Sequence, residues 1–299
     1  MDAVRSREEM DAVQSRNEIG QQTMEDRTKQ TKAGVPQNTD NKQRKALFFD
    51  IDGTLLGDDL RAPKSAVDAL HEARKRGHLV LINSGRTYAL ARCVLHYVEA
   101  DGLLCGCGTE IHLGDRCIYQ YLLPDTTVDE LRKDAAACHV DLVLEGPEGA
   151  AFSPDPCRKT RELLGFVREQ HGEILYPYEA RYAVNKFCLQ EKEGSDIGTM
   201  LRKYEASFYL IDRGGFYECV PKGHNKGEAI LRVLQYVGIP LSEAYAFGDS
   251  MNDYDMLKTV PHAVIMGDHA KGLEAVADFT TKRLEEDGIA YAMKTLGII

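Results

Sequence analysis

Carboxylates and a hydroxyl follow three short apolar runs of the chain, and such side chains can bind a cation and react with phosphorus. Asp50 and Asp52 lie in the segment DIDGT, Ser84 lies in NSGR, and Asp249 lies in GDSMND. A single pair of carboxylates could be a solvated turn at the end of a strand. Three polar clusters, each directly after an apolar run, favour one shared site.

The acidic residues are those expected at a magnesium site. Asp50 can reach a cation with its side chain, Asp52 with its backbone carbonyl, and Asp249 adds a third oxygen ligand. Mg²⁺ takes octahedral oxygen ligation and keeps several waters, so a phosphate oxygen and waters can complete its sphere. The cation would also remove the repulsion between these carboxylates and a phosphate dianion, and it would polarise the phosphoryl group.

The same clusters supply the groups for phosphoryl transfer. One carboxylate can attack phosphorus to give an aspartyl-phosphate, and a second can protonate the leaving alcohol and then activate water. The hydroxyl of Ser84 and the amide of Gly85 can donate to a phosphoryl oxygen at the start of a helix. Lys226, in GHNKG at another predicted helix start, is our candidate for the lysine that balances the charge.

The elements around these clusters predict an α/β fold, a doubly wound parallel sheet. The run at 45–49 shows no alternation of apolar and polar residues, as in a strand buried on both faces. Strands and helices then alternate, and active sites of such sheets lie at the carboxyl ends of the strands. The predicted strands of this sheet are 45–49, 78–82, 103–105, 244–247 and 262–266. The predicted helices are 63–75, 87–98, 226–237, 252–258, 270–276 and 288–295.

In the middle of the chain the pattern of predicted helices and strands changes to an α+β pattern, which indicates an inserted α+β cap domain. It shows predicted helices at 126–137, 157–170 and 195–204 and strands at 140–145, near 151, and at 184–190, 206–212 and 215–220. We predict a core domain of 45–121 and 214–299 and a cap of 122–213. Residues 1–44 are too polar to offset their ordering entropy and are predicted to be a disordered tail, with a partner-binding helix or a targeting peptide as alternatives.

Composition limits the partners. The 299 residues carry a formal net charge of −10, which disfavours non-specific nucleic-acid binding. No apolar stretch approaches the roughly 20 residues of a membrane helix. The eight cysteines and the absence of a secretory signal favour reduced thiols in a cytoplasmic protein over disulfides or a metal framework, and the histidines show no metal spacing.

The four ordered motifs resemble the haloacid dehalogenase superfamily of aspartyl-phosphate phosphatases. They are DIDGT at 50–54, Ser84 in NSGR, Lys226, and GDSMND at 248–253. The insertion between the second and third motifs is similar to that of the Cof-type, type IIB cap class. The resemblance runs from about Lys45 to the C-terminus.

The resemblance implies a role for each matching position. Asp50 matches the nucleophile and a metal ligand, and Asp52 matches the acid/base that also gives its carbonyl to the metal. The other positions implied are Ile51, Ser84, Gly85, Lys226 and Asn252 for phosphate, Asp249 for magnesium, and Asp253 as an acid that holds metal-bound water or Lys226. The family often has Asn-Gly-Ala where Cys107, Gly108 and Thr109 stand here, which leaves substrate contacts at that turn in doubt.

Several side chains outside the motifs have two interpretations. For Arg86, a substrate contact and a pair on a helix are equally favoured. For Lys186 and Glu145 we favour solvated surface over the cleft. We expect His224 to be structural and the tyrosines at 176, 178 and 182 to belong to the cap core.

The function predicted by the resemblance is magnesium-dependent hydrolysis of a small phosphate monoester, a sugar phosphate or a similar metabolite. The alternatives are a sugar phosphomutase of the same superfamily and a non-catalytic regulatory binding protein. The intact Asp50, Asp52, Lys226 and Asp249 argue against the binding protein. The oligomeric state is open.

Overall fold

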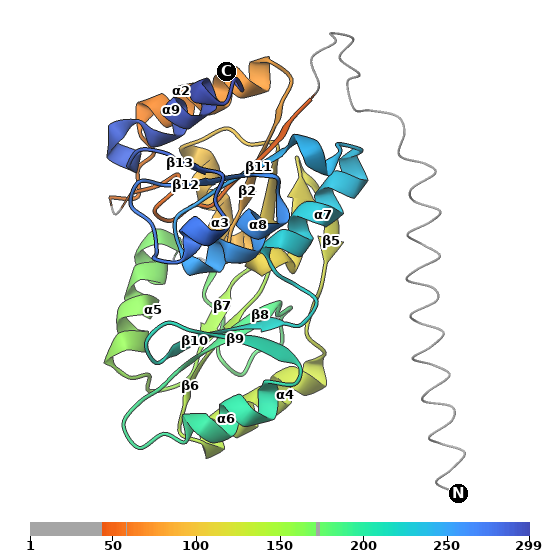
Figure 1. The fold of residues 1–299 in the computed structure, drawn as a ribbon. Coiled ribbons are helices and arrows are strands. Elements are labelled where there is room, and N and C mark those ends of the chain that lie inside the picture. Colours follow the sequence, from red (N-terminus) through yellow and green to blue (C-terminus); the bar gives the residue numbers. More distant parts are fainter. Residues whose placement is uncertain (1–43, 58, 172–173) are drawn as a thin grey trace, which may run out of the picture. The chain divides into compact units, whose positions relative to one another are not determined.

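The computed structural model describes residues 44–57, 59–171 and 174–299, which build two β-sheets with helices packed on them (Figure 1). The predicted tail at 1–44 lies outside the described residues apart from Arg44. The predicted α/β class with an inserted α+β cap is confirmed.

The core sheet has eight strands in the order β13-β12-β11-β1-β2-β3-β4-β5. The six strands from β13 to β3 are parallel, and β4 and β5 continue the sheet as an antiparallel hairpin. The strands are β1 (Ala46–Phe49), β2 (Leu79–Asn83), β3 (Gly102–Cys105), β4 (Glu110–Leu113), β5 (Arg116–Gln120), β11 (Ala244–Gly248), β12 (His262–Ile265) and β13 (Phe279–Thr280). All four residues of β1 are fully buried, as its unbroken apolar sequence predicts.

Helices cover both faces of this sheet. Helices α2 (Lys64–Lys75) and α9 (Gly288–Thr295) pack side by side on one apolar cluster, to which the short α3 (Tyr88–Ala91) contributes Ala91. Helices α7 (Lys226–Val237) and α8 (Tyr254–Thr259) pack on the other cluster. Among the described residues, no helix is long and apolar enough to cross a membrane.

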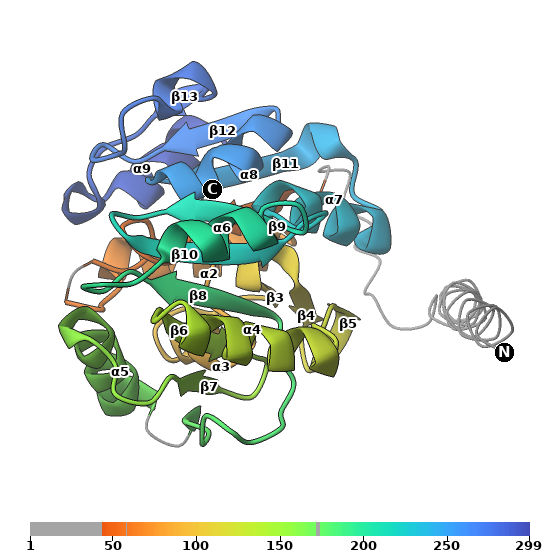
Figure 2. The ribbon, with the colours of Figure 1, turned by 90° about the horizontal axis from the view of Figure 1, so that it is seen from below.

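The second sheet forms the cap. Its five antiparallel strands have the order β7-β6-β8-β10-β9, and they are β6 (Asp141–Glu145), β7 (Ala150–Phe152), β8 (Lys186–Gln190), β9 (Phe208–Asp212) and β10 (Phe216–Pro221). Helices α4 (Asp125–Ala137) and α6 (Ile197–Tyr204) cover its outer face, turned away from the core (Figure 2), and α5 (Arg158–His171) lies at its side.

The structure differs from the sequence-based expectations at one domain boundary, one helix and one hairpin. Strand β10 pairs with β8 and β9, whereas the boundary at 213 assigned it to the core; we propose that the inserted segment continues to Pro221. The predicted helix at 270–276 is one turn of 3₁₀ helix, because Gly272 has a φ of 103° and interrupts the helix. The hairpin of β4 and β5 was not predicted.

Candidate active site

Three neighbouring parallel strands bring the predicted polar clusters to one edge of the core sheet. In the sheet, β1 lies between β11 and β2, and Phe49 stands opposite both Phe247 and Ile82. The three strands therefore end at the same level, followed by Asp50, Asp249 and Ser84. Phe49 and Phe247 stack with ring centroids 4.4 Å apart, which fixes this register beneath the site.

Lys226 lies beneath these strand ends and joins two acidic residues. Its side chain is only 1% exposed, and its Nζ lies 2.6 Å from Asp50 Oδ1 and 2.5 Å from Asp253 Oδ1. The amide of Asn83 donates to the backbone carbonyl of Lys226 at 2.9 Å and holds the start of α7 against β2. Burial lowers the pKa of Lys226, but Asp253 and Asp50 raise it well above its usual range, so the ammonium stays charged.

Asp253 organises the loop that carries Asp249. One of its carboxylate oxygens accepts a hydrogen bond from Lys226 Nζ. The other accepts hydrogen bonds from the backbone N–H groups of Asp249 and Ser250, each at 3.0 Å. Because the residue is fully buried and both of its oxygens are engaged, it is placed to support the site. Of the two contacts that the resemblance implies for it, metal-bound water or Lys226, the structure has the one with Lys226.

Asp50 and Asp249 lie in a region of concentrated negative charge. Burial and then the charge of Asp253 raise the pKa of Asp50 to about 7, against the opposing effect of Lys226. Burial also raises the pKa of Asp249 to about 6, although Thr54 donates a hydrogen bond to it at 2.7 Å. A cation bound between them would favour both charged forms.

The donor atoms present fit a hard divalent cation. Carboxylate oxygens of Asp50, Asp249 and Asp253 all lie within 4.8 Å of one another. Since Asp253 already accepts three hydrogen bonds, Asp50 and Asp249 are the carboxylates with oxygens left for a metal. An all-oxygen donor set of this kind suits Mg²⁺.

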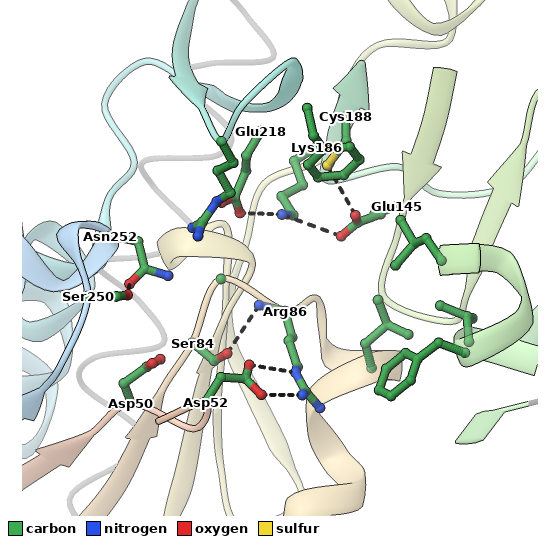
Figure 3. A pocket seen from close by; sticks show the side chains of 17 residues that line it. Asp50, Asp52, Ser84, Arg86, Glu145, Lys186, Cys188, Glu218, Ser250 and Asn252 are labelled. Atoms are coloured by element: carbon green, nitrogen blue, oxygen red, sulfur yellow. Dashed lines mark hydrogen bonds and ion pairs between the residues drawn. The ribbon is translucent and has the colours of Figure 1, made fainter. Parts of the chain in front are cut away.

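Asp52 points toward a guanidinium group instead of the other carboxylates. Arg86 Nη2 lies 2.5 Å from one oxygen of Asp52, and Arg86 Nε lies 3.0 Å from the other (Figure 3). Asp52 is the more exposed partner, with 56% of its side chain accessible. Arg86 lines the cavity and pairs with Asp52, and its contact with a substrate stays a prediction. For Asp52 to transfer a proton, this bidentate pair has to open.

The remaining predicted phosphate contacts are divided between the cavity wall and the interior. Ser84, Gly85 and Asn252 line the cavity together with Asp50 and Asp52. Ile51 is fully buried, so only its backbone is suited to a ligand. The helix after Gly85 is short: α3 begins at Tyr88 after Thr87.

The cap contributes a charged cluster to the opposite wall, and our preference for solvated surface at Lys186 and Glu145 was wrong. Lys186 is 3% exposed, and its Nζ lies 2.5 Å from Glu218 and 3.4 Å from Glu145. Arg213 reaches Glu218 at 3.1 Å. Burial raises the pKa of Glu218, but Lys186 and Arg213 lower it to about 2. These four residues, the cap charge cluster, all line the cavity.

Sequence reasoning missed Arg213 and Glu218 because nothing in their local pattern distinguishes them from surface charges. The signal that was available lies in β8 and β10. Lys186 stands in an apolar run, and Glu218 pairs across the strands with Cys188. A charge inside an apolar strand has to find a partner.

The cavity between core and cap holds about 270 Å³. One part of its wall is apolar, formed by Leu90 of the core and by Leu163, Phe166 and Val167 of α5. Leu90, Leu163 and Val167 also belong to a small apolar cluster that joins α3 to α5. The cavity is close to the lower end of the size range of ligand sites, which favours a small molecule.

Two further expectations outside the motifs agree with the structure. His224 accepts or donates a hydrogen bond with the Tyr119 hydroxyl at 2.7 Å and does not line the cavity, consistent with a structural role. Tyr178 and Tyr182 pack against the apolar cluster of the cap, and Tyr176 stacks on Tyr182.

Gly53→Ala is expected to lower kcat/KM by about 10²-fold, the effect expected of a displacement near 1 Å. Gly53 has a φ of 81°, and an added Cβ would meet Asp249 Oδ2 at 2.4 Å, so the carboxylate has to move. The matched control is Gly57→Ala, where the nearest atom would be 3.5 Å away and φ is not positive. Steady-state kinetics of both variants test this, and equal activity of the two would contradict it.

The chain is similar to known phosphatases in sequence and in fold. A family model described as haloacid dehalogenase-like hydrolase matches residues 47–293. The protein YkrA of Bacillus subtilis is 30% identical over 85% of this chain and 98% of its own length. The HMP-PP phosphatase of Klebsiella pneumoniae is 29% identical over 77% of this chain and 87% of its own length. The solved structure of a subclass IIB sugar phosphatase, BT4131, superposes with a TM-score of 0.71 at 26% identity, covering 85% of this chain and all of that one.

The chain belongs to the haloacid dehalogenase-like hydrolases. Within that family, the two-sheet arrangement and the relatives confirm the predicted Cof-type hydrolase with a type IIB cap and the predicted enzyme class, a phosphoric monoester hydrolase.

Proposed function

We propose that this chain hydrolyses a small phosphate monoester, a sugar phosphate or a similar metabolite, in a magnesium-dependent reaction through an aspartyl-phosphate on Asp50. The observation that carries the proposal is the buried contact of Lys226 with Asp50 and Asp253 beneath a cavity that Asp52 also lines. When bound by Asp50 and Asp249, Mg²⁺ would neutralise the phosphoryl oxygens and polarise phosphorus.

The residues divide the reaction into two displacements at phosphorus. After it leaves Arg86, Asp52 takes up a proton from solvent. A carboxylate oxygen of Asp50 then bonds to phosphorus while the ester P–O bond breaks, and the leaving oxygen takes the proton from Asp52. Asp52 then accepts a proton from water as the water oxygen bonds to phosphorus. The bond between phosphorus and Asp50 breaks, and inorganic phosphate leaves. Lys226 balances the charge of Asp50 throughout.

Substrate binding is proposed to release Asp52 from Arg86. In the bidentate pair both oxygens of Asp52 accept guanidinium N–H groups, so neither faces a leaving group freely. A phosphate dianion in the cavity would compete with Asp52 for Arg86, because Arg binds phosphate in the same forked geometry. Asp52 would then turn toward the ester oxygen.

The cap charge cluster supports a neutral polyhydroxylated leaving group. Lys186 and Arg213 supply two positive charges and Glu145 and Glu218 two negative ones, so the cluster has no net charge with which to select a second phosphate. It presents charged donors and acceptors together, and a hydroxyl group can use both at once.

Activity against a panel of phosphate esters tests the proposed function. We expect inorganic phosphate release from one or more sugar phosphates, its loss after EDTA, and its recovery with Mg²⁺. Chromatography of the sugar products separates hydrolysis from a mutase reaction, which would yield isomeric sugar phosphate with little free phosphate. Full activity in EDTA, or no phosphate release from any ester, would refute the proposal.

Arg213→Gln is expected to lower kcat/KM for the preferred sugar phosphate by about 10–100-fold, the range of a lost charged hydrogen bond. Its effect on p-nitrophenyl phosphate should be below about threefold, because that leaving group has no hydroxyl to bind. Arg158→Gln, on the cap but 87% exposed and away from the cavity, is the matched control. Equal losses on both substrates would contradict a role in leaving-group selection.

A further inference from the structure

A second cluster of metal-binding side chains lies on the hairpin of β4 and β5, among residues that do not line the active-site cavity. Glu110 and His112 are two apart on β4, so they project from the same face. Cys117 of β5 stands opposite His112 in the strand register. One ligand atom from each of the three residues lies within 4.8 Å of the others.

One oxygen of the cluster is buried without a partner. Glu110 is 2% exposed, and its Oε1 lies 2.7 Å from His112 Nε2 and 3.2 Å from the Gln120 amide. Its Oε2 has no hydrogen-bond partner. A buried carboxylate oxygen left unpaired is costly, and a bound ion or water usually satisfies such an oxygen.

Neighbouring groups orient the ligands and leave a path from solvent. The ring of His112 stacks on Tyr88 with centroids 3.9 Å apart and planes 11° apart, which holds its orientation. Cys117 is exposed, so an ion can enter from its side. The Sγ–H of Cys117 donates to the Tyr119 carbonyl at 3.3 Å, and metal binding would replace that contact and release the thiol proton to solvent.

We propose that Glu110, His112 and Cys117 bind a divalent cation of the zinc type at this outer hairpin. A carboxylate, an imidazole and a thiolate together suit Zn²⁺, whereas Mg²⁺ prefers oxygen ligands alone. Three protein ligands leave the fourth tetrahedral position to water. Ligation through Oε2 would satisfy the unpaired oxygen while Oε1 keeps the Gln120 amide. The individual histidine and cysteine spacings did not indicate this site, because the hairpin itself was not predicted.

A cation at this site would cross-link β4 to β5 at the edge of the core sheet, where the chain passes from the core into the cap. Strand β5 is the last strand of the sheet and ends at Gln120. The next residue, Tyr121, is held to Thr109 by a backbone hydrogen bond of 2.7 Å and to the Asn185 amide of the cap at 2.8 Å. A cation joining β4 to β5 would therefore stiffen the first of the two links between core and cap.

Cobalt binding to the full-length, EDTA-treated protein tests the proposal, because a thiolate bound to Co²⁺ absorbs in the near ultraviolet and an all-carboxylate site does not. We expect one such Co²⁺ per chain, displaced by Zn²⁺ but not by Mg²⁺. Cys117→Ser should abolish the band and His112→Ala should weaken Co²⁺ binding at least tenfold, while phosphatase activity with Mg²⁺ stays within about twofold.

The paired substitution Cys138→Ser with His139→Gln removes another adjacent cysteine and histidine and is the control, which should keep the band. Absence of a thiolate band in the unaltered protein would overturn the proposal. So would a band that survives Cys117→Ser, because the thiolate would then belong to another cysteine. Circular dichroism and the midpoint of thermal unfolding in EDTA show that each variant is folded.

Discussion

Asp50→Asn is expected to lower phosphate release by at least about 10⁴-fold, because an amide cannot attack phosphorus to form the aspartyl-phosphate. The fold should survive the change. Asp50 is buried, and its pKa is raised from 3.8 to about 7. Ionising it therefore lowers the free energy of unfolding as the pH rises from about 4 to 7, and the full penalty applies above pH 7. Removing that charge should leave the midpoint of thermal unfolding in EDTA equal to or above that of the unaltered protein.

The matched control is Asp255→Asn on α8, an exposed carboxylate near the same motif. It should retain full activity and the same unfolding midpoint. Retained activity in Asp50→Asn would refute its role as the nucleophile. Loss of activity with a lower unfolding midpoint would refute the expectation that the change acts on chemistry alone.

Lys226→Met is expected to destabilise the folded protein by about 3–5 kcal/mol, the range observed when one partner of a buried ion pair is removed. The lysine is the shared partner of Asp50 and Asp253, both of them nearly or fully buried. Methionine fills a similar volume and leaves the two carboxylates to repel each other. Urea unfolding in EDTA measures the change in the free energy of unfolding, and phosphate release should be lost as well.

A double substitution separates the two effects of Lys226. Adding Asp253→Asn to Lys226→Met removes one of the unpaired charges, so part of the lost stability should return while activity does not. Lys258→Met, at an exposed position of α8, is the control and should change neither quantity. If Lys226→Met lowers the free energy of unfolding by less than about 1 kcal/mol, the buried carboxylates are not stabilised by Lys226 and the expectation is contradicted.

The core of the site was predictable because it depends on short-range patterns. An apolar run followed by carboxylates locates a strand end, and parallel strands in one sheet bring such ends together, as they do for Asp50, Ser84 and Asp249. The boundary of the cap was not predictable in the same way. Strand β10 is assigned by its pairing with β8 and β9, and a single sequence contains no record of that pairing.

The wall opposite the nucleophile was missed for a related reason. Lys186 and Glu218 are 32 positions apart and meet only because β8 and β10 are neighbours in the cap sheet. Arg86 was equally ambiguous until its distance to Asp52 was known. In each case the role of a charged side chain is set by its partner, and the partner lies on another element.

The most direct test of the central claim is to identify the phosphorylated residue. Asp52→Asn lacks the base for the second step, while p-nitrophenyl phosphate needs little acid help in the first, so the phosphoenzyme should accumulate. We predict that borohydride reduction followed by peptide mass spectrometry finds the acyl-phosphate at Asp50 alone. Phosphate on any other residue, or no covalent phosphoenzyme during turnover of p-nitrophenyl phosphate by this variant, would contradict the account.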